Sequence, residues 1–264
     1  QGYSSAASDV YKRQAMNSSK KSILNSNFTY LAAFVLPVIM MMALYYTRGI
    51  FPWGNECYLR SDMYHQYAPF FSELWHKIRN GESLTYSWNI GMGTNFTSLF
   101  AYYLASPSNW FVALFPQKYT IEIMNAFIIL KIAGSSLSLT YYLTKHNNNK
   151  HVIAAIFGMF YGMSGFIAAY SWNIMWLDCV ILIPLIMLGL ERLVNENRCI
   201  FYCITLGLCI FTNYYIAIMV CLSVVIYYVV LMIAYNGIKS PMQYVKKFIN
   251  FCVCLLYTSD AADE

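Results

Sequence analysis

Charged side chains are scarce in this chain. Asp, Glu, Lys and Arg make up only 11% of its 264 residues, and hydrophobic residues make up 59%. Soluble domains carry about 25% charged residues. The apolar runs approach or exceed the roughly 20 residues that cross a bilayer as a helix, and they are continuous, unlike the alternating segments of a transmembrane β-barrel. The sequence therefore predicts an all-α polytopic membrane protein.

The local motifs of many soluble enzymes are also absent. The chain has no Walker loop, dinucleotide fingerprint, HExxH motif or GxSxG motif. It has no CxxC pair, so neither a zinc site nor a disulfide framework is indicated. Most cysteines lie in apolar runs, where they act as small hydrophobic residues, and only Cys57 lies in a polar loop. The excess of Lys and Arg is spread over loops between apolar runs, which indicates membrane orientation and no nucleic-acid partner.

Both ends of the chain look foreign to the protein. Residues 4–14 and 254–263 can be encoded by one short DNA element and by its reverse complement. This is the pattern of a sequencing-library adapter translated by accident, and such segments have no bearing on the fold. We therefore expect an adapter-derived tail at 1–14, a cytoplasmic N-terminus at 15–27, the N-terminal part of a transmembrane domain at 28–253 and a second adapter-derived tail at 254–264.

The apolar runs give the positions of the expected membrane spans. These lie at residues 28–46, 120–144, 152–170, 175–193, 199–214, 216–235 and from 248 onward. The stretch 96–115 is also apolar, but Ser106-Pro107-Ser108-Asn109 interrupts it. Whether it crosses the membrane decides the orientation of every later span.

The distribution of basic residues indicates that the stretch 96–115 does not cross the membrane. If it does not, the short loops rich in Lys and Arg all lie in the cytoplasm, and the short turns without them lie outside. We therefore expect a multi-pass protein of the cell membrane with a cytoplasmic N-terminus. Residues 47–119 then form a long first extracytoplasmic loop, in which 96–115 is a re-entrant or surface-lying segment.

The long loop contains a predicted amphipathic helix. Apolar residues recur at helical spacing from Met63 to Ile78, and Asn80-Gly81 ends the pattern. The charged residues of the segment fall on the other side, namely Glu73, His76, Lys77 and Arg79. Such a helix is expected to lie in the membrane interface. The stretch 86–95, which is rich in glycine, aromatic and amide residues, is expected to be an ordered loop.

Asp62 is the carboxylate that introduces this helix. A carboxylate at a membrane surface can deprotonate an acceptor hydroxyl, stabilise a cationic transition state or hold a metal. Ser61 or Asp62 could instead simply cap the helix. His65 is three residues away, so a divalent metal is conceivable, but two ligands are too few to assign a metal site.

Two ionisable residues fall within or at the end of expected spans. Lys131 lies near the middle of 120–144, where a charge costs about 2.5–3.5 kcal/mol, which makes it a functional candidate by default. It could contact a lipid phosphate, or it could pair with polar groups inside the bundle. Asp178 lies at the outer end of 175–193, beside Asn173 and interfacial tryptophans. It could belong to a site or form an ion pair with Lys131.

Several segments together resemble one family. The segments that resemble the YfhO-type bacterial membrane proteins are Asp62 with Gln66-Tyr67, Tyr86-Ser87-Trp88-Asn89, Gly91-Met92-Gly93-Thr94-Asn95-Phe96, Ser106-Pro107-Ser108-Asn109, Asn173 with Trp176-Leu177-Asp178, Pro184-Leu185 and Gly189-Leu190-Glu191-Arg192. That family is similar to the GT-C glycosyltransferases, which move a sugar from a polyprenyl-phosphate carrier to an acceptor outside the cytoplasm. The resemblance implies a GT-C-like transmembrane helix bundle whose first outer loop bears surface helices and an essential acid.

The resemblance also implies roles for single residues. Asp62 becomes the candidate catalytic base or metal-linked acid, and Lys131 a contact for carrier phosphate. The expected substrate-binding residues are Tyr64, Gln66, Tyr67, Asn89, Asn95, Lys131, Asn173 and Asp178. The implied partners are a polyprenyl-phosphate-linked sugar, a cell-envelope glycopolymer such as a teichoic acid, and the lipid bilayer. Two other interpretations remain open: a transporter or flippase for lipid-linked sugars or another solute, and a noncatalytic assembly subunit.

Overall fold

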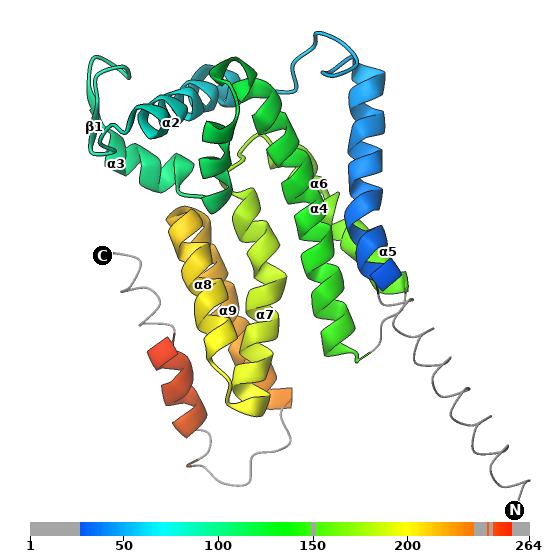
Figure 1. Cartoon of the computed structure of the whole chain (residues 1–264). Helices are drawn as coiled ribbons and strands as arrows, with labels where there is room; N and C mark the ends of the chain where they lie inside the picture. Colours follow the sequence, from blue (N-terminus) through cyan, green and yellow to red (C-terminus); the bar gives the residue numbers. More distant parts are fainter. Residues whose placement is uncertain (1–26, 149–151, 235–241, 243–244, 255–264) are drawn as a thin grey trace, which may run out of the picture.

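The computed structural model describes residues 27–148, 152–234, 242 and 245–254, and it is almost entirely helical (Figure 1). The first helix is Asn27–Arg48. The later elements are η1 (Met63–Tyr67), α2 (Ala68–Asn80), β1 (Tyr86–Ser87), β2 (Thr94–Asn95), α3 (Phe96–Leu99), η2 (Phe100–Leu104), η3 (Pro107–Leu114), η4 (Gln117–Tyr119), α4 (Thr120–His146), α5 (Val152–Gly162), α6 (Gly165–Tyr170), α7 (Leu177–Glu196), α8 (Ile200–Thr212) and α9 (Tyr214–Ala234). Residues 245–254 are also helical.

The described part of the chain contains 4 helices long and apolar enough to cross a membrane: Asn27–Arg48, Gln117–His146, Val152–Tyr170 and Tyr214–Ala234. They match four of the expected spans closely. The expected span 175–193 is α7, which has 20 residues but carries several charged side chains. The expected span 199–214 is α8, whose 13 residues extend only about 20 Å. The polytopic all-α class predicted from the sequence is confirmed.

Residues 49–119 gather at one end of the helix bundle, which we call the loop end (Figure 1). The first helix ends there and α4 begins there. Within this region, 96–115 is divided among α3, η2 and η3, and its longest helix has 8 residues. The break falls at Ala105-Ser106, immediately before Pro107, which cannot donate a backbone hydrogen bond to a preceding turn.

Helix α2 packs against protein on more than its apolar side, since only part of its predicted polar face is exposed: Arg79 is exposed, but Glu73 and Lys77 are not. Phe71 and Leu74 are fully buried in a core cluster that includes residues of η2, η3 and α4. Glu73 and Lys77, which we expected on the solvent side, are only 7% and 3% exposed. The chain after Gly81 folds back over them and supplies polar partners that helical periodicity alone cannot reveal.

Small residues let the central helices approach closely. Gly158 and Gly162 of α5 are four residues apart and lie directly against the α4 backbone and side chains around Ser136. Gly189 of α7 lies against Tyr202 of α8, where an added Cβ would come within 2.7 Å of the Tyr202 Cα. Pairs of small residues with this spacing are typical of helix contacts in membranes. These contacts hold α5 close to α4 and allow α7 to approach α8 closely.

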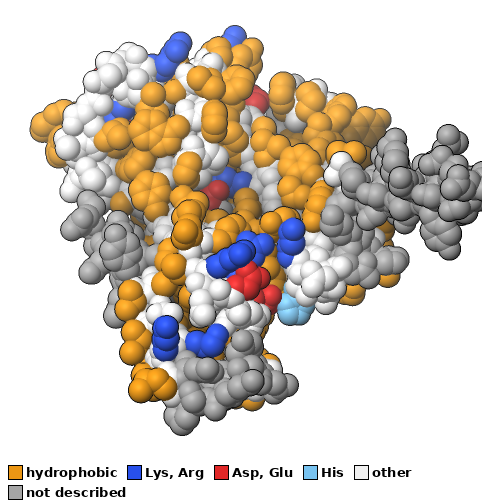
Figure 2. All heavy atoms as spheres, turned by 60° about the horizontal axis from the view of Figure 1, so that its bottom comes forward, with side chains coloured by type: hydrophobic (Ala, Val, Ile, Leu, Met, Phe, Trp, Pro, Cys, Tyr) orange, Lys and Arg blue, Asp and Glu red, His pale blue; other side chains and the backbone are white. Residues whose placement is uncertain are grey.

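The opposite end of the bundle carries a polar cluster around Glu191. Figure 2 shows acidic and basic side chains and a histidine gathered there below a largely apolar surface. Glu191 lies in the last two turns of α7 and is only 7% exposed. Its Oε1 accepts hydrogen bonds from the hydroxyls of Tyr142 (2.8 Å) and Tyr227 (2.5 Å), and it contacts His146 Nδ1 at 2.9 Å. Partners on α4 and α9 therefore bury this carboxylate of α7.

Candidate functional site

Two polar pockets open at the loop end. The larger pocket, of about 800 Å³, lies between the end of the first helix, the following loop and the C-terminal end of α6. Its lining residues are Leu44, Arg48, Ile50, Glu56, Cys57, Tyr58, Arg60, Ser61, Ala168, Ala169, Ser171 and Trp172. The smaller pocket, of about 320 Å³, is lined by Phe51, Gly54, Asn55, Glu56, Cys57, Tyr64, Ile121, Glu122 and Asn125. Glu56 and Cys57 line both pockets.

Asp62 lies between residues that line these pockets, since Ser61 belongs to the larger pocket and Tyr64 to the smaller one. Its carboxylate is exposed and makes no capping hydrogen bond to η1. Among the described residues it has no hydrogen-bond or ion-pair partner. Asp62 thus occupies the N-cap position of η1, as one alternative from the sequence has it, but its carboxylate does not cap the helix. A solvent-exposed carboxylate without partners remains available to a ligand or substrate.

Tyr67 joins this region to the turn before α7. Its hydroxyl donates a hydrogen bond of 3.0 Å to Asn173 Oδ1, and its ring stacks with Trp172 at an interplanar angle of 9°. Burial raises the pKa of the Tyr67 phenol, and the nearby Tyr103 and Asp62 raise it further. The phenol thus stays protonated and donates to Asn173. The amide nitrogen of Asn173 is buried without a partner among the described residues.

Gln66, the neighbour of Tyr67, also faces protein. Its Nε2 donates a 3.3 Å hydrogen bond to the Tyr103 hydroxyl. Tyr64 is 49% exposed and lines the smaller pocket. Of the predicted substrate-binding residues in this segment, Tyr64 is therefore the one whose side chain faces open space beside Asp62.

Asn89 and Asn95 have structural partners in the chain after α2. Asn89 Nδ2 donates to Glu73 Oε2 at 3.0 Å, and Ser87 Oγ donates to Glu73 Oε1 at 2.6 Å. Lys77 Nζ lies 3.7 Å from the same carboxylate. Asn95 Oδ1 caps α3 by accepting hydrogen bonds from the backbone N–H groups of Thr97 and Ser98. Both amides are thus used to stabilise this part of the loop end.

Lys131 and Asp178 form an ion pair inside the bundle. Lys131 Nζ lies 2.6 Å from Asp178 Oδ2 and also donates to the Ile174 carbonyl at 3.2 Å. The side chains are 5% and 14% exposed. Of the two alternatives that the sequence left open for each residue, the structure shows the internal pair. This pair links α4 to the start of α7.

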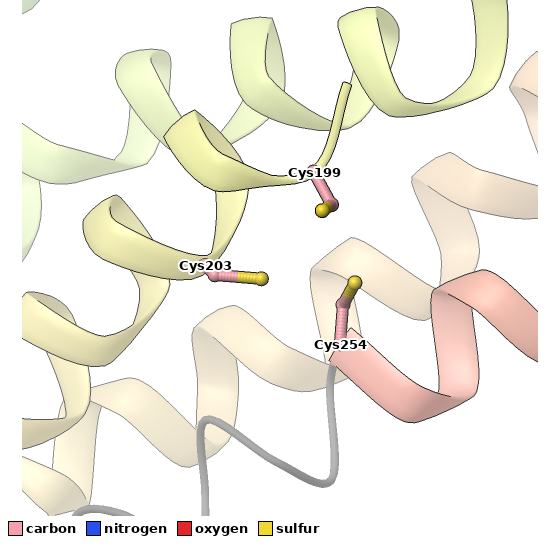
Figure 3. Close-up of side chains that lie close together, drawn as sticks. All are labelled: Cys199, Cys203 and Cys254. Carbon is pink, nitrogen blue, oxygen red and sulfur yellow. The ribbon is translucent and has the colours of Figure 1, made fainter. Parts of the chain in front are cut away.

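Two clusters of potential metal ligands lie in the described part of the chain. Cys199, Cys203 and Cys254 bring their thiols close together (Figure 3). However, Cys254 falls in the segment that we expect to be adapter-derived, so we assign no site to this cluster. Glu73, His76 and Glu82 form the second cluster. There the Glu73 oxygens already accept from Ser87 and Asn89, and Lys77 lies within 3.7 Å of both Glu73 and Glu82.

Sequence reasoning missed several residues that line the pockets. Arg48 and Arg60 both face the larger pocket, and neither has an ion-pair partner among the described residues. Little in the sequence marks these two arginines as site residues, because long loops are exempt from the positive-inside rule and an arginine in a loop is ordinarily solvated. Only the fold brings the end of the first helix beside residue 60.

The family comparison agrees with the fold. A family model described as bacterial membrane protein YfhO matches residues 32–259. Among the curated proteins and among the solved structures, nothing matches this chain. Because the match covers most of the chain, this protein belongs to the YfhO family of bacterial membrane proteins.

Proposed function

We propose that the full-length protein is a membrane glycosyltransferase of the GT-C type. It would transfer a sugar from a polyprenyl-phosphate carrier to a cell-envelope glycopolymer outside the cytoplasm. The observation that carries this proposal is the exposed carboxylate of Asp62, which has no partner among the described residues. Asp62 directly follows Arg60 and Ser61, which line the polar pocket of about 800 Å³. An acid in that position can meet a substrate that remains anchored in the lipid.

In the proposed reaction, Asp62 accepts the proton of an acceptor hydroxyl. That oxygen forms a bond to the anomeric carbon of the sugar, while the bond from the anomeric carbon to the phosphate oxygen breaks. The phosphate leaves with the lipid. A positioned general base contributes about 10²–10⁴-fold to such a step.

The larger pocket supplies suitable groups for the carrier. Arg48 and Arg60 offer guanidinium groups, which match the geometry of phosphate oxygens. Trp172 and Tyr58 offer aromatic faces with polar edges, and these suit a sugar. Lys131 is a weaker candidate for phosphate binding, since Asp178 already neutralises it at 2.6 Å. We therefore transfer the proposed phosphate contact from Lys131 to the two arginines.

Asp62→Asn and Asp62→Ala test the catalytic assignment. In the full-length protein, both should lower sugar transfer from a polyprenyl-phosphate donor by at least about 100-fold, because neither side chain can accept the proton. The measurement is the initial rate of product formation by purified protein in detergent or liposomes. Glu82→Gln is the control, since Glu82 is an exposed acid of the same loop region outside both pockets. Because Glu82 lies 3.6 Å from Lys77, the melting temperature of this variant is compared with that of the wild type.

Wild-type transfer rates in both folded Asp62 variants would show that Asp62 is not the base. No transfer by the wild-type protein, combined with carrier-dependent movement of a lipid-linked sugar across the bilayer, would favour the flippase interpretation instead. Neither activity in the wild type would favour an assembly subunit.

The exposed thiol of Cys57 tests the proposed orientation. Cys57 lies at the loop end and is the exposed cysteine among those described, the others being buried or partly buried. A membrane-impermeant maleimide added to intact cells should label the wild-type protein and leave Cys57→Ser unlabelled. As a control for the other side, Asn147→Cys on the Cys57→Ser background should react only after the cells are permeabilised, because Asn147 is exposed at the opposite end. The reverse pattern would place the loop end in the cytoplasm.

A further inference from the structure

The smaller pocket at the loop end is lined by two carboxylates, those of Glu56 and Glu122, and by the buried amide of Asn125. Glu122 and Asn125 lie in the first two turns of α4, three residues apart, so they share one face of the helix. Glu56 enters from the loop that follows the first helix. Two carboxylates and the amide of Asn125 thus line one pocket from two separate parts of the chain, and Asn55 and Tyr64 add further oxygen atoms.

Two of these oxygen atoms are buried without a hydrogen-bond donor. Asn125 is only 5% exposed, and its Oδ1 has no partner in the described part of the structure. Glu122 Oε2 is likewise buried without a partner. In folded proteins, buried acceptors of this kind are nearly always paired, and an exception commonly marks a bound water or ion. Both atoms therefore indicate a ligand that donates to oxygen or coordinates it.

Charge distinguishes between these two kinds of ligand. Within the described residues, no lysine, arginine or histidine forms an ion pair with Glu56 or Glu122. Water would satisfy the hydrogen bonds but would leave two carboxylates in one pocket without a counter-charge, and one oxygen of Glu122 is buried there. A cation satisfies the oxygen atoms and offsets the charge.

The chemistry of the ligands defines the class of cation. Carboxylate and amide oxygens are hard ligands, which bind Mg²⁺, Ca²⁺ and Mn²⁺ in preference to softer metals. A pocket of about 320 Å³ also leaves room for the waters that complete the coordination of such an ion. We propose that Glu56, Glu122 and Asn125 bind a hard divalent cation at the loop end.

This site differs from the pair of ligands considered in the sequence. His65 is not among the residues that line the smaller pocket, and Asp62 is not either. Since Glu56 also lines the larger pocket, a cation here would fix the loop 50–57 against α4 at the boundary between the two pockets. The proposal does not depend on glycosyltransferase activity.

Manganese binding tests the site directly. Full-length protein purified in detergent and treated with EDTA is titrated with Mn²⁺, and the free ion is followed by electron paramagnetic resonance. Mg²⁺ and Ca²⁺ are then added as competitors, and the melting temperature is measured with and without each ion. The wild type should bind Mn²⁺ at one site, release it to Mg²⁺ or Ca²⁺, and melt at a higher temperature with the ion.

Substitutions locate the site. Glu122→Gln and Asn125→Leu should each weaken Mn²⁺ binding by about tenfold or more, since each removes one ligand or its charge. Asn125→Asp keeps the shape of the side chain and adds a charge, so it should tighten binding. Glu196→Gln, an exposed acid at the opposite end, is the control and should leave the affinity unchanged.

Absence of binding to the folded wild-type protein would overturn the proposal. Equal affinities in the wild type, Glu122→Gln and Asn125→Asp would overturn it as well. If Asn125→Leu fails to fold, the comparison of Asn125→Asp with the wild type still decides, because the two side chains have nearly the same shape.

Discussion

Lys131→Met should lower the free energy of unfolding by about 3–5 kcal/mol, the usual cost of removing one partner from a buried ion pair. The substitution removes the 2.6 Å contact with Asp178 and the hydrogen bond to the Ile174 carbonyl. It leaves a carboxylate that is only 14% exposed without its counter-charge. The measurement is unfolding of the full-length protein in detergent, followed by denaturant or heat.

The double variant Lys131→Met/Asp178→Leu separates the pair's structural role from a role in phosphate binding. Replacing both charges by apolar residues of similar size should recover most of the stability, because the desolvation penalty disappears together with the attraction. If the pair is only structural, the double variant should also keep its transfer activity and its KM for the polyprenyl-phosphate donor. A stable double variant with a strongly raised KM would return Lys131 to the phosphate site.

The membrane helices could be predicted from the sequence because a bilayer imposes their length. Continuous apolar runs located the first helix, α4 and α9 to within a few residues. The helix expected at 152–170 is less regular, since it is divided into α5 and α6 near Ser164. Such a division costs little when neighbouring helices satisfy the freed backbone groups, so it leaves no clear mark in hydropathy.

Buried polar contacts were the main source of error. Glu73, Lys77 and Glu191 look like solvent-facing residues in any periodic pattern, yet each is at least nine-tenths buried. Their partners are distant in sequence: Asn89 for Glu73, and Tyr142 and Tyr227 for Glu191. A single sequence does not indicate which loop will cover which carboxylate. The Lys131–Asp178 pair was foreseen as one alternative because an isolated charge at that depth is so costly.

For the candidate site, the sequence indicated the region of the chain but not the residues that line the two pockets. The concentration of polar residues after the first helix pointed to Asp62, and the structure leaves that carboxylate without a partner among the described residues. The predicted amides Asn89 and Asn95 instead stabilise the loop on α2 and the start of α3. Arg48, Glu56 and Glu122 gain their importance only when the first helix, the loop and α4 meet at the loop end.

Gly158→Leu should disrupt the contact between α4 and α5. A Cβ at position 158 would collide with the Ser136 carbonyl and with the Thr140 hydroxyl. A Cβ at position 162 would likewise come within 2.8 Å of the Ile132 carbonyl oxygen. Because one of the colliding groups is backbone, a change of rotamer cannot relieve the overlap. Overpacking of this kind lowers stability by about 1–3 kcal/mol and occasionally more. For a close helix contact in a membrane, we expect a loss of stability at the upper end of this range.

Gly207→Leu is the matched control, because Gly207 lies in the apolar helix α8 and an added Cβ meets nothing within 4 Å there. The two variants change hydrophobicity and helix propensity alike, so their difference in melting temperature isolates the contact between α4 and α5. We expect Gly158→Leu to melt well below the wild type and Gly207→Leu to melt near it. Equal melting temperatures would mean that α5 does not depend on the close approach to α4, and the packing of small residues would then have to be assigned to α7 and α8 alone.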